Sequence, residues 1–167
     1  MKRRASHIPG FTIVELLIVI VVIAILAAIT IVAYTGVQQR ADETVVQNDI
    51  SQLARKMDLW KIDHNDVYPA VDGNQLASVG ISISSNAYLQ DSRNNFYYCS
   101  SADGTSYSFG IVSKNNQGYF LTNGTVSQQS GGSTYQTQTC AQVGEPSTTG
   151  TSGYVGGSDT WASWIDT

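Results

Sequence analysis

The residue whose type and position most clearly suggest a chemical role is Glu15, the one charged side chain in an otherwise apolar run. Residues 11–34 are 24 positions without Gly or Pro. As a helix they would extend roughly 36 Å, enough to cross a hydrocarbon core of about 30 Å. A carboxylate in such a helix costs about 2.5–3.5 kcal/mol near its centre and less toward its ends, so Glu15 is a functional candidate. The simpler interpretation is that Glu15, one turn from Phe11, reaches the membrane interface.

The charges before this run give its orientation. Lys2, Arg3 and Arg4 precede it, and no matching cluster follows until Arg40, Arg55 and Lys56. The positive-inside rule then keeps the N-terminus in the cytoplasm and sends residues after about 35 across the membrane. An ordinary secretory signal has a shorter apolar region and an A-x-A-like cleavage site, which this run lacks. A lipoprotein signal would need a Cys after the cut, but the first is Cys99. A plain signal anchor stays open.

The junction between the leader and the apolar run resembles a known signal. A short basic leader ending in Gly10, followed by Phe11-Thr12-Ile13-Val14-Glu15, resembles the class III signal of type IV pilins and pseudopilins. The resemblance implies that a prepilin peptidase cuts between Gly10 and Phe11 and N-methylates Phe11. It also implies that Glu15 neutralises the Phe11 amine of a neighbouring subunit during assembly. Two opposite charges in apolar surroundings are both stabilised by pairing, and they can pair only when a second helix arrives at a matching stagger. Neutralisation of the Glu15 charge would thus be coupled to the register between neighbouring helices. A contact between Phe11 and Glu15 within one helix, at i,i+4, is the alternative.

Two positions depart from the family's pattern. Many members have Gly where Ala24 stands and Pro where Val32 stands, and that region is often unwound in their fibres. Without Pro, nothing here removes a backbone hydrogen bond or forces a kink. We therefore expect a continuous helix through Val32 in the free subunit. Gly36 and the β-branched run 29–32 are its weaker points, and melting in a filament stays open.

The helix continues beyond the apolar run as an amphipathic segment. Apolar residues recur in steps of 4, 3, 4 and 3, the stripe of a helix that packs on a core: Val46, Ile50, Leu53, Met57 and Trp60. The charged positions off this stripe are Asp42, Glu43, Asp49, Arg55, Lys56 and Lys61. We predict one helix from Phe11 to about Asp63. It ends in a polar turn followed by Tyr68-Pro69, which again resembles the family.

A β-rich region follows the long helix. Residues 74–79 are predicted as a short helix and 80–84 as a brief edge strand. Residues 95–100, 106–113 and 118–123 are rich in aromatic and β-branched side chains and predict an antiparallel meander of three strands. The aromatic residues expected in its core are Tyr97, Tyr107, Phe109, Tyr119 and Phe120. The fold class predicted is α+β, with the long helix packed on a small antiparallel sheet.

The C-terminal part is rich in Gly, Ser, Thr and Gln. Between Glu145-Pro146 and Ser158 we expect loop or disorder. Trp161, Trp164 and Ile165 should dock on the domain or on a neighbouring subunit. Residues 156–159 have a weak likeness to a calcium loop, with one Asp only. Residues 123–125 match a glycosylation sequon by pattern alone.

The two cysteines, Cys99 and Cys140, both fall on the translocated side. In an oxidising compartment their pairing is the default expectation, and closing a loop of about 42 residues would stabilise the fold by roughly 4 kcal/mol. A metal pair and two free thiols are the alternatives. Pairing would make the segment between them resemble the disulfide-bounded loop near the pilin C-terminus.

Composition and motifs argue against catalysis and general nucleic-acid binding. Without Lys2, Arg3 and Arg4, six basic side chains face thirteen acidic ones, a net charge of −7. Beyond the leader, His64 is the one histidine, in a polar turn typical of a solvated helix end. No phosphate-binding loop, metal-ligand spacing or nucleophile motif is present, so we expect no enzyme, no cofactor and no metal site.

These observations predict four segments: a leader (1–10), a transmembrane or fibre-core helix (11–34), the amphipathic half of the same helix (35–63) and an extracytoplasmic β-rich head with a Gly/Ser/Thr-rich tail (64–167). The resemblance implies a type IV pilus subunit for adhesion, twitching motility or DNA uptake. The precursor would cross the cytoplasmic membrane once, and the assembled form would be a surface fibre. Its partners would be other copies of the chain, the prepilin peptidase, and the assembly platform with its ATPase. The alternatives are a pseudopilin of a secretion or competence system and a membrane-anchored binding module that never polymerises.

Overall fold

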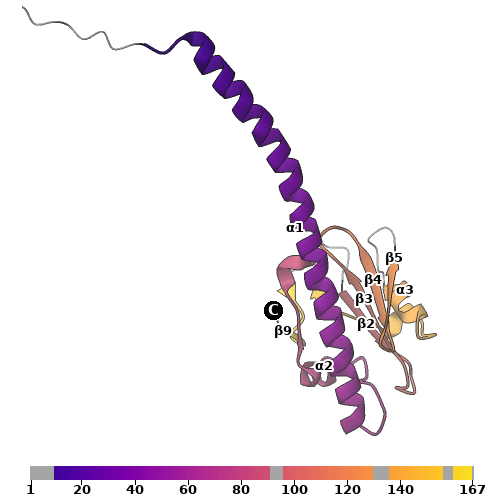
Figure 1. Cartoon of the computed structure of the whole chain (residues 1–167). Coiled ribbons are helices and arrows are strands. Elements are labelled where there is room, and N and C mark those ends of the chain that lie inside the picture. The colour runs from indigo at the N-terminus through magenta and orange to yellow at the C-terminus, as the bar shows by residue number, and fades with distance from the viewer. Residues whose placement is uncertain (1–9, 91–95, 130–135, 156–159, 167) are drawn as a thin grey trace, which may run out of the picture. The chain divides into compact units, whose positions relative to one another are not determined.

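The computed structural model describes residues 10–90, 96–129, 136–155 and 160–166. One helix, α1 (Ile13–Asp63), runs without interruption for 51 residues (Figure 1). The predicted continuous helix is therefore confirmed, including its passage through Val32 and its end at Asp63. The chain divides into two units after Gln38, so α1 contributes its apolar half to the first unit and its amphipathic half to the second.

The amphipathic half of α1 buries the predicted apolar stripe. Val46, Ile50, Leu53 and Met57 are buried, whereas Trp60 at the end of the stripe is only half-buried. The ring of Trp60 stacks on His64, with 3.6 Å between ring centroids. Asp49 departs from the prediction, because this carboxylate is 7% exposed although it lies off the stripe.

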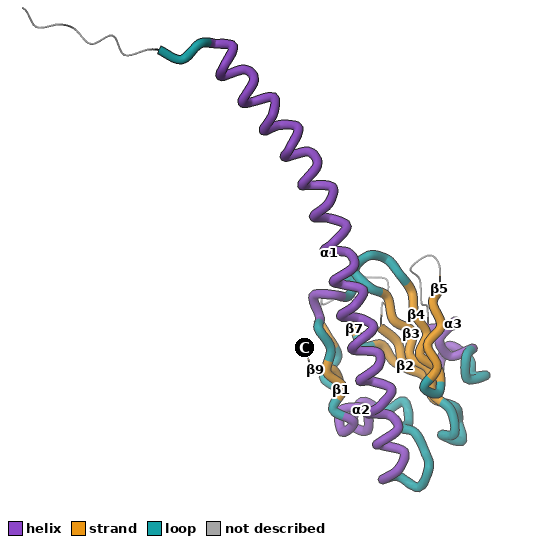
Figure 2. The backbone as a smooth tube through the Cα atoms, viewed as in Figure 1, coloured by secondary structure: helices purple, strands orange, loops and turns teal. Residues whose placement is uncertain are grey.

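The main sheet has five strands in the order β5-β4-β3-β2-β6, and every neighbouring pair is antiparallel. Figure 2 shows β2, β3, β4 and β5 side by side. The predicted three-stranded meander is confirmed as β2 (Phe96–Ser100), β3 (Tyr107–Val112) and β4 (Gly118–Thr122). Two strands of this sheet were not predicted, β5 (Thr125–Gln129) and β6 (Thr151–Ser152). The signal for β5 was Asn123-Gly124, where both residues have positive φ, as in the two-residue turn of a tight hairpin.

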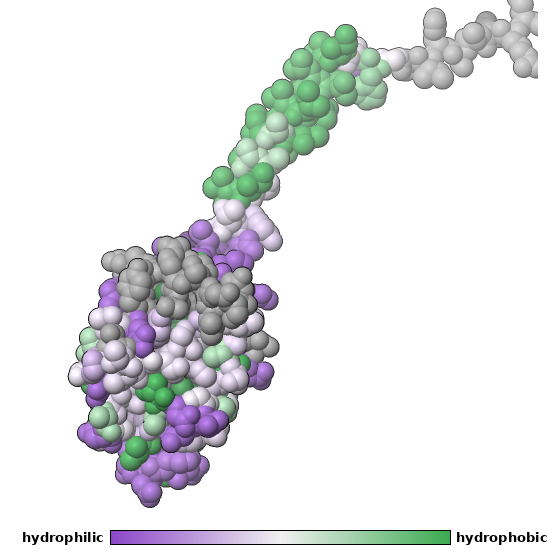
Figure 3. Space-filling model, turned by 180° about the vertical axis from the view of Figure 1, so that it is seen from behind, coloured by the Kyte–Doolittle hydropathy of each residue, from purple (hydrophilic) through white to green (hydrophobic). Residues whose placement is uncertain are grey.

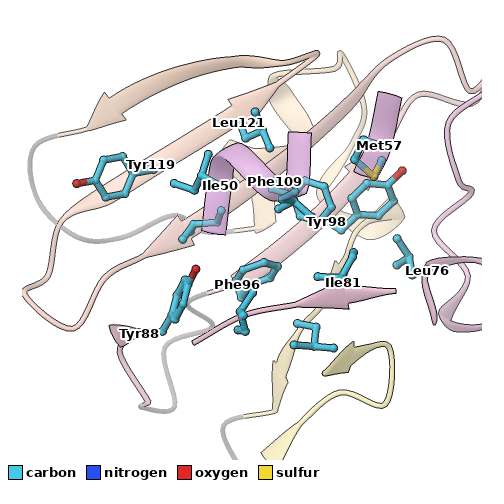
Figure 4. Close-up of a cluster of buried hydrophobic side chains, with 14 of the residues drawn as sticks. Ile50, Met57, Leu76, Ile81, Tyr88, Phe96, Tyr98, Phe109, Tyr119 and Leu121 are labelled. Atoms are coloured by element: carbon cyan, nitrogen blue, oxygen red, sulfur yellow. The ribbon is translucent and has the colours of Figure 1, made fainter. Parts of the chain in front are cut away.

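The core lies between α1 and the facing side of the sheet (Figure 4). It is rich in aromatic rings: Phe96 and Phe109 pack edge to face with 5.8 Å between centroids, and Tyr98 lies 4.7 Å from Phe109. All five aromatic residues predicted for the core are buried. Tyr97 and Phe120 point to the opposite side of the sheet from Phe96 and Leu121, because successive strand residues alternate between faces.

The turn after α1 is held against the sheet. The Tyr68 amide donates to the Gly104 carbonyl at 2.8 Å, and the Tyr98 hydroxyl donates to the Pro69 carbonyl at 2.5 Å. Gly104 has φ +69°, and a Cβ there would collide with the side chain of Val67. The Tyr68-Pro69 segment is thus held by the β2–β3 turn and by Tyr98. The sequence of the segment alone could not predict these contacts.

Short elements complete the head. The predicted short helix is α2 (Gly73–Val79), and the predicted edge strand is β1 (Ile81–Ser82), which pairs in parallel with β9 (Ile165–Asp166). Single turns of 3-10 helix cover Ser85–Ala87 and Ser147–Thr149. Helix α3 (Gln136–Ala141) was not predicted.

The prediction of loop or disorder for the run from Glu145 to Ser158 is wrong in part. β6 (Thr151–Ser152) joins the main sheet, and β7 (Tyr154–Val155) pairs with β8 (Thr160–Trp161). This segment is ordered because its backbone packs closely on the core at Gly153. A Cβ on Gly153 would meet the rings of Phe96 and Trp164 at 2.9 and 3.1 Å. Trp164 and Ile165 pack on the domain, which was one of the two alternatives predicted for them. The suggested calcium loop lies outside the described residues.

Candidate functional site

The start of α1 places Thr12 and Glu15 in a reciprocal arrangement. The amide and the hydroxyl of Thr12 donate to one oxygen of the Glu15 carboxylate at 2.9 and 2.7 Å. The Glu15 amide donates to the Thr12 hydroxyl oxygen at 3.2 Å. This is a capping box, in which a Thr before the first turn and a Glu three residues later satisfy free backbone donors. It explains why α1 begins at Ile13 rather than at Phe11.

The capping box gives Glu15 a partner within its own chain. Thr12 carries this role and was not singled out from the sequence, although its Thr-x-x-Glu spacing is a recognised signal of a helix start. The Glu15 carboxylate accepts hydrogen bonds from Thr12, and Phe11 is 86% exposed. Any cation that pairs with Glu15 must therefore join or displace the hydrogen bonds from Thr12.

The apolar half of α1 exposes its side chains on every side. Large hydrophobic residues from Phe11 to Val37 are all exposed, and in Figure 3 they form a continuous green surface. Within the described part of the chain, α1 is the one helix long and apolar enough to cross a membrane. Such a surface needs lipid or other apolar helices around it, because exposing it to water is unfavourable in proportion to its area.

The amphipathic half of α1 is held on the head by two carboxylates. Asp49 accepts hydrogen bonds from the Ser84 amide at 2.8 Å and from the Tyr88 hydroxyl at 3.0 Å. Burial, together with the charge and hydrogen bond of Asp49, raises the pKa of Tyr88. From the sequence, Asp49 was only one of several charges off the apolar stripe.

Glu43 is the second carboxylate anchor. One of its oxygens accepts from the Ser113 hydroxyl at 2.6 Å and the Asn115 amide at 3.0 Å, and the other accepts from the Tyr119 hydroxyl at 2.5 Å. Burial first, and then the hydrogen bond to Glu43, raise the pKa of Tyr119 to about 12. A burial pattern in the sequence could not find this anchor, because its partners lie about 70 residues away.

The predicted disulfide is present. Cys99 on β2 and Cys140 on α3 are bonded and completely buried. Gly150 packs on this bond, since a Cβ there would approach both sulfur atoms at 2.8 Å. The disulfide therefore joins α3 to the sheet and leaves room only for glycine where the C-terminal segment passes.

The remaining polar candidates do not form a recognisable catalytic or metal site. His64 is exposed, and its Nδ1 lies 2.8 Å from the Trp60 carbonyl oxygen. Among the residues that the structure describes, no group of three or more His, Cys, Asp and Glu side chains could hold a metal ion. The Asn123 side-chain oxygen accepts from the Tyr107 amide at 2.9 Å, so this sequon residue supports the hairpin.

Comparison with known proteins identifies the N-terminal region. Residues 7–31 match the family described as the prokaryotic N-terminal methylation motif. Over 71 residues the chain is 37% identical to the type II secretion system core protein G of Aeromonas hydrophila, covering 42% of this chain and 47% of that protein. Over 76 residues it is 37% identical to the major component of the type IV wide pilus of Thermus thermophilus, covering 46% and 55%.

The chain therefore spans about half the length of the curated relatives it matches. No solved structure matches it at a significant level. Residues 7–31 thus carry the prokaryotic N-terminal methylation motif, and part of the chain is similar to proteins of type II secretion systems and of a type IV pilus. The similarity extends both to secretion-system core proteins and to a pilus component.

Proposed function

We propose that this protein is the structural subunit of a type IV pilus. Its precursor spans the cytoplasmic membrane through residues 11–34, with residues 1–10 inside and the head, residues 64–167, outside. A prepilin peptidase cleaves between Gly10 and Phe11 and methylates the Phe11 amine. The observation that carries the proposal is the exposed apolar helix with Glu15 one turn from this junction, within a matched methylation motif.

The position of Glu15 gives assembly its specificity. In the single chain, the capping box with Thr12 satisfies the carboxylate partly but leaves its charge uncompensated. The Phe11 amine of a second copy supplies the missing positive charge, and a charge-assisted hydrogen bond is stronger than a neutral one. A neighbouring helix can deliver that amine only at one stagger, so the pair fixes register while the apolar side chains provide the contact area.

The fibre needs machinery as well as contacts. Lipid tails are as apolar as the side chains of α1, so leaving the membrane gives little hydrophobic gain. An assembly platform and its ATPase would supply the work of extraction. Once assembled, the apolar halves of many copies would form the fibre core and stay buried. The head, which is rich in Ser, Thr, Asn, Gln and Gly, would face the medium and serve adhesion, twitching motility or DNA uptake, with no catalytic role.

The second candidate is a pseudopilin of a type II secretion or competence system. It is favoured by the secretion-system core proteins among the relatives, which are 36–37% identical to this chain over 71 and 72 residues. The disulfide between β2 and α3, with its Ser/Thr/Gln-rich surroundings, favours the pilus subunit. A membrane-anchored binding module that never polymerises would use the same helix only as an anchor.

The test is a deletion strain complemented with wild type, Gly10→Ala, Glu15→Ala or the control Asp58→Ala, an exposed acid on the same helix. Mass spectrometry of the N-terminus, electron microscopy of surface fibres and assay of secreted proteins are the measurements. We expect methylated Phe11 in wild type, no cleavage for Gly10→Ala, and cleavage without fibres for Glu15→Ala. A secretion defect with no surface fibres in the wild type would favour the pseudopilin, and tolerance of both variants would favour the plain anchor.

A further inference from the structure

The turn between β4 and β5 contains the one Asn-Gly pair of the sequence, Asn123-Gly124. Such a pair can react with itself. The Gly124 nitrogen attacks the carbonyl carbon of the Asn123 side chain and closes a five-membered ring, and the side-chain nitrogen takes the Gly124 proton and leaves as ammonia. Water then opens the ring to aspartate or isoaspartate. Glycine favours the attack because it has no Cβ to obstruct the approach of its nitrogen.

The surroundings of the pair leave room for this reaction. Asn123 and Gly124 are both exposed, and nothing lies within 4 Å of the place that a Cβ on Gly124 would take. Strand β5 lies at the edge of the sheet beside β4, and residues 125–128 are exposed. An edge hairpin with few buried contacts opens more readily than the central strands of a sheet. Water therefore reaches the turn, and the turn can open without unfolding of the head.

In the closed hairpin, a single residue of β3 holds both reacting groups. The Tyr107 amide donates to the Asn123 side-chain oxygen at 2.9 Å, and the Gly124 amide donates to the Tyr107 hydroxyl at 3.1 Å. The Asn123 amide also donates to the Tyr107 carbonyl at 3.2 Å. Ring closure must reorient the Asn123 side chain and remove the Gly124 proton. It therefore has to break the first two of these hydrogen bonds.

Tyr107 is itself fixed in the core. It is completely buried, and its ring packs edge to face on Tyr68, with 4.5 Å between centroids, and on Phe109, with 5.9 Å. A hydroxyl on a ring held in this way keeps its position. The two hydrogen bonds are therefore lost when the β4–β5 turn moves away from β3, and not through motion of Tyr107.

We propose that Asn123 is a latent modification site: it deamidates spontaneously through the ring closed by Gly124, at a rate set by how often the β4–β5 turn leaves Tyr107. The product carries one more negative charge. Isoaspartate also adds a methylene group to the backbone of a two-residue turn, and the length of that turn fixes the register of the hairpin. The modified hairpin therefore cannot close as before. This goes beyond the proposed function and does not depend on it, because the reaction needs only the chain and water.

Peptide mapping by mass spectrometry tests the proposal on the full chain in nonionic micelles, incubated in mildly alkaline buffer with and without urea. We expect aspartate and isoaspartate at Asn123 in urea, and a rate at least about tenfold lower in the folded chain because hydrogen bonds must break first. Asn65 and Asn116 are the internal controls, since they are exposed and have positive φ but no glycine follows them. Both should stay intact while Asn123 reacts.

Tyr107→Phe removes the hydroxyl and keeps the two backbone hydrogen bonds to Asn123. It should accelerate deamidation of the folded chain by about 3- to 10-fold, the factor that one net hydrogen bond represents, and leave the rate in urea unchanged. Gly153→Ala is the matched control, because it disturbs packing beside β6 and not the turn. It should leave the rate in the folded chain unchanged, which separates local opening from unfolding of the whole head.

Wild type alone keeps the test valid if Tyr107→Phe does not fold. Exchange of the Gly124 amide hydrogen requires the same opening as ring closure. The ratio of the deamidation rates in the unfolded and folded chain should therefore match the protection of the Gly124 amide against hydrogen exchange. Equal deamidation of folded and unfolded wild type would overturn the proposal. An unchanged rate in folded Tyr107→Phe, or an equal acceleration in Gly153→Ala, would do the same.

Discussion

The buried carboxylate of Asp49 gives the sharpest quantitative prediction. Asp49→Ala removes the acceptor of two donors, the Tyr88 hydroxyl and the Ser84 amide. Tyr88 is 2% exposed, so its hydroxyl cannot turn to water. A buried donor without a partner costs about 1–3 kcal/mol. Ser84 is exposed, which lowers the cost at its amide. We expect a net loss of about 2–4 kcal/mol of unfolding free energy.

The higher helix propensity of alanine partly offsets this loss of stability, so the control variant must have the same gain in helix propensity. Alanine is a better helix former than aspartate by about 0.5 kcal/mol, a gain that Asp49→Ala also receives. Asp58→Ala lies on the same helix with an exposed carboxylate, and it obtains the gain without breaking the Asp49 contacts. The control should therefore be neutral or slightly stabilised.

The assay is urea unfolding of the full chain in nonionic micelles, followed by tryptophan fluorescence. Trp164 packs in the core and should report loss of the head. With a denaturant slope of about 2 kcal/mol per molar, the midpoint for Asp49→Ala should fall by roughly 1–2 M. Adding Tyr88→Phe to Asp49→Ala removes the orphaned hydroxyl and should recover about 1 kcal/mol. Strict additivity of the two changes, or a shift in Asp49→Ala no larger than in Asp58→Ala, would refute the reasoning.

Three further predictions follow from the head. Gly153→Ala should cost about 1–3 kcal/mol in the same urea assay because the methyl group meets packed aromatic rings, and an unchanged midpoint would contradict that packing. Replacing Cys99 and Cys140 together by Ala should lower stability by roughly 4 kcal/mol, and a non-reducing peptide map should lose the linked peptide. Burial holds the pKa of Tyr88 above 10, and that of Tyr119 at about 12. Unfolded phenols lose their protons first, so the contribution of these two tyrosines to stability should be constant below about pH 9 and fall above about pH 10, with absorbance at the phenolate band rising as the chain unfolds.

Much of the fold could be predicted because its signals are local. The continuous helix follows from a run without Gly or Pro and from the period of Val46, Ile50, Leu53 and Met57, all of which are buried. The meander follows from aromatic runs separated by turn residues. By contrast, β5 was missed although Asn123-Gly124 was an available signal, because its strand is exposed and shows no alternation.

The sequence by itself determined the apolar helix, the place of Glu15 within it, the amphipathic stripe and the three central strands, because these depend on composition and periodicity over neighbouring residues. Only the tertiary structure decided that Asp49 and Glu43 anchor the helix, that β6 forms one edge of the sheet beside Gly153, and that β1 pairs with β9. Each of these depends on one or two contacts between residues far apart in the chain. Two-residue strands have no period to read, and a carboxylate becomes an anchor only when folding brings its donors to it.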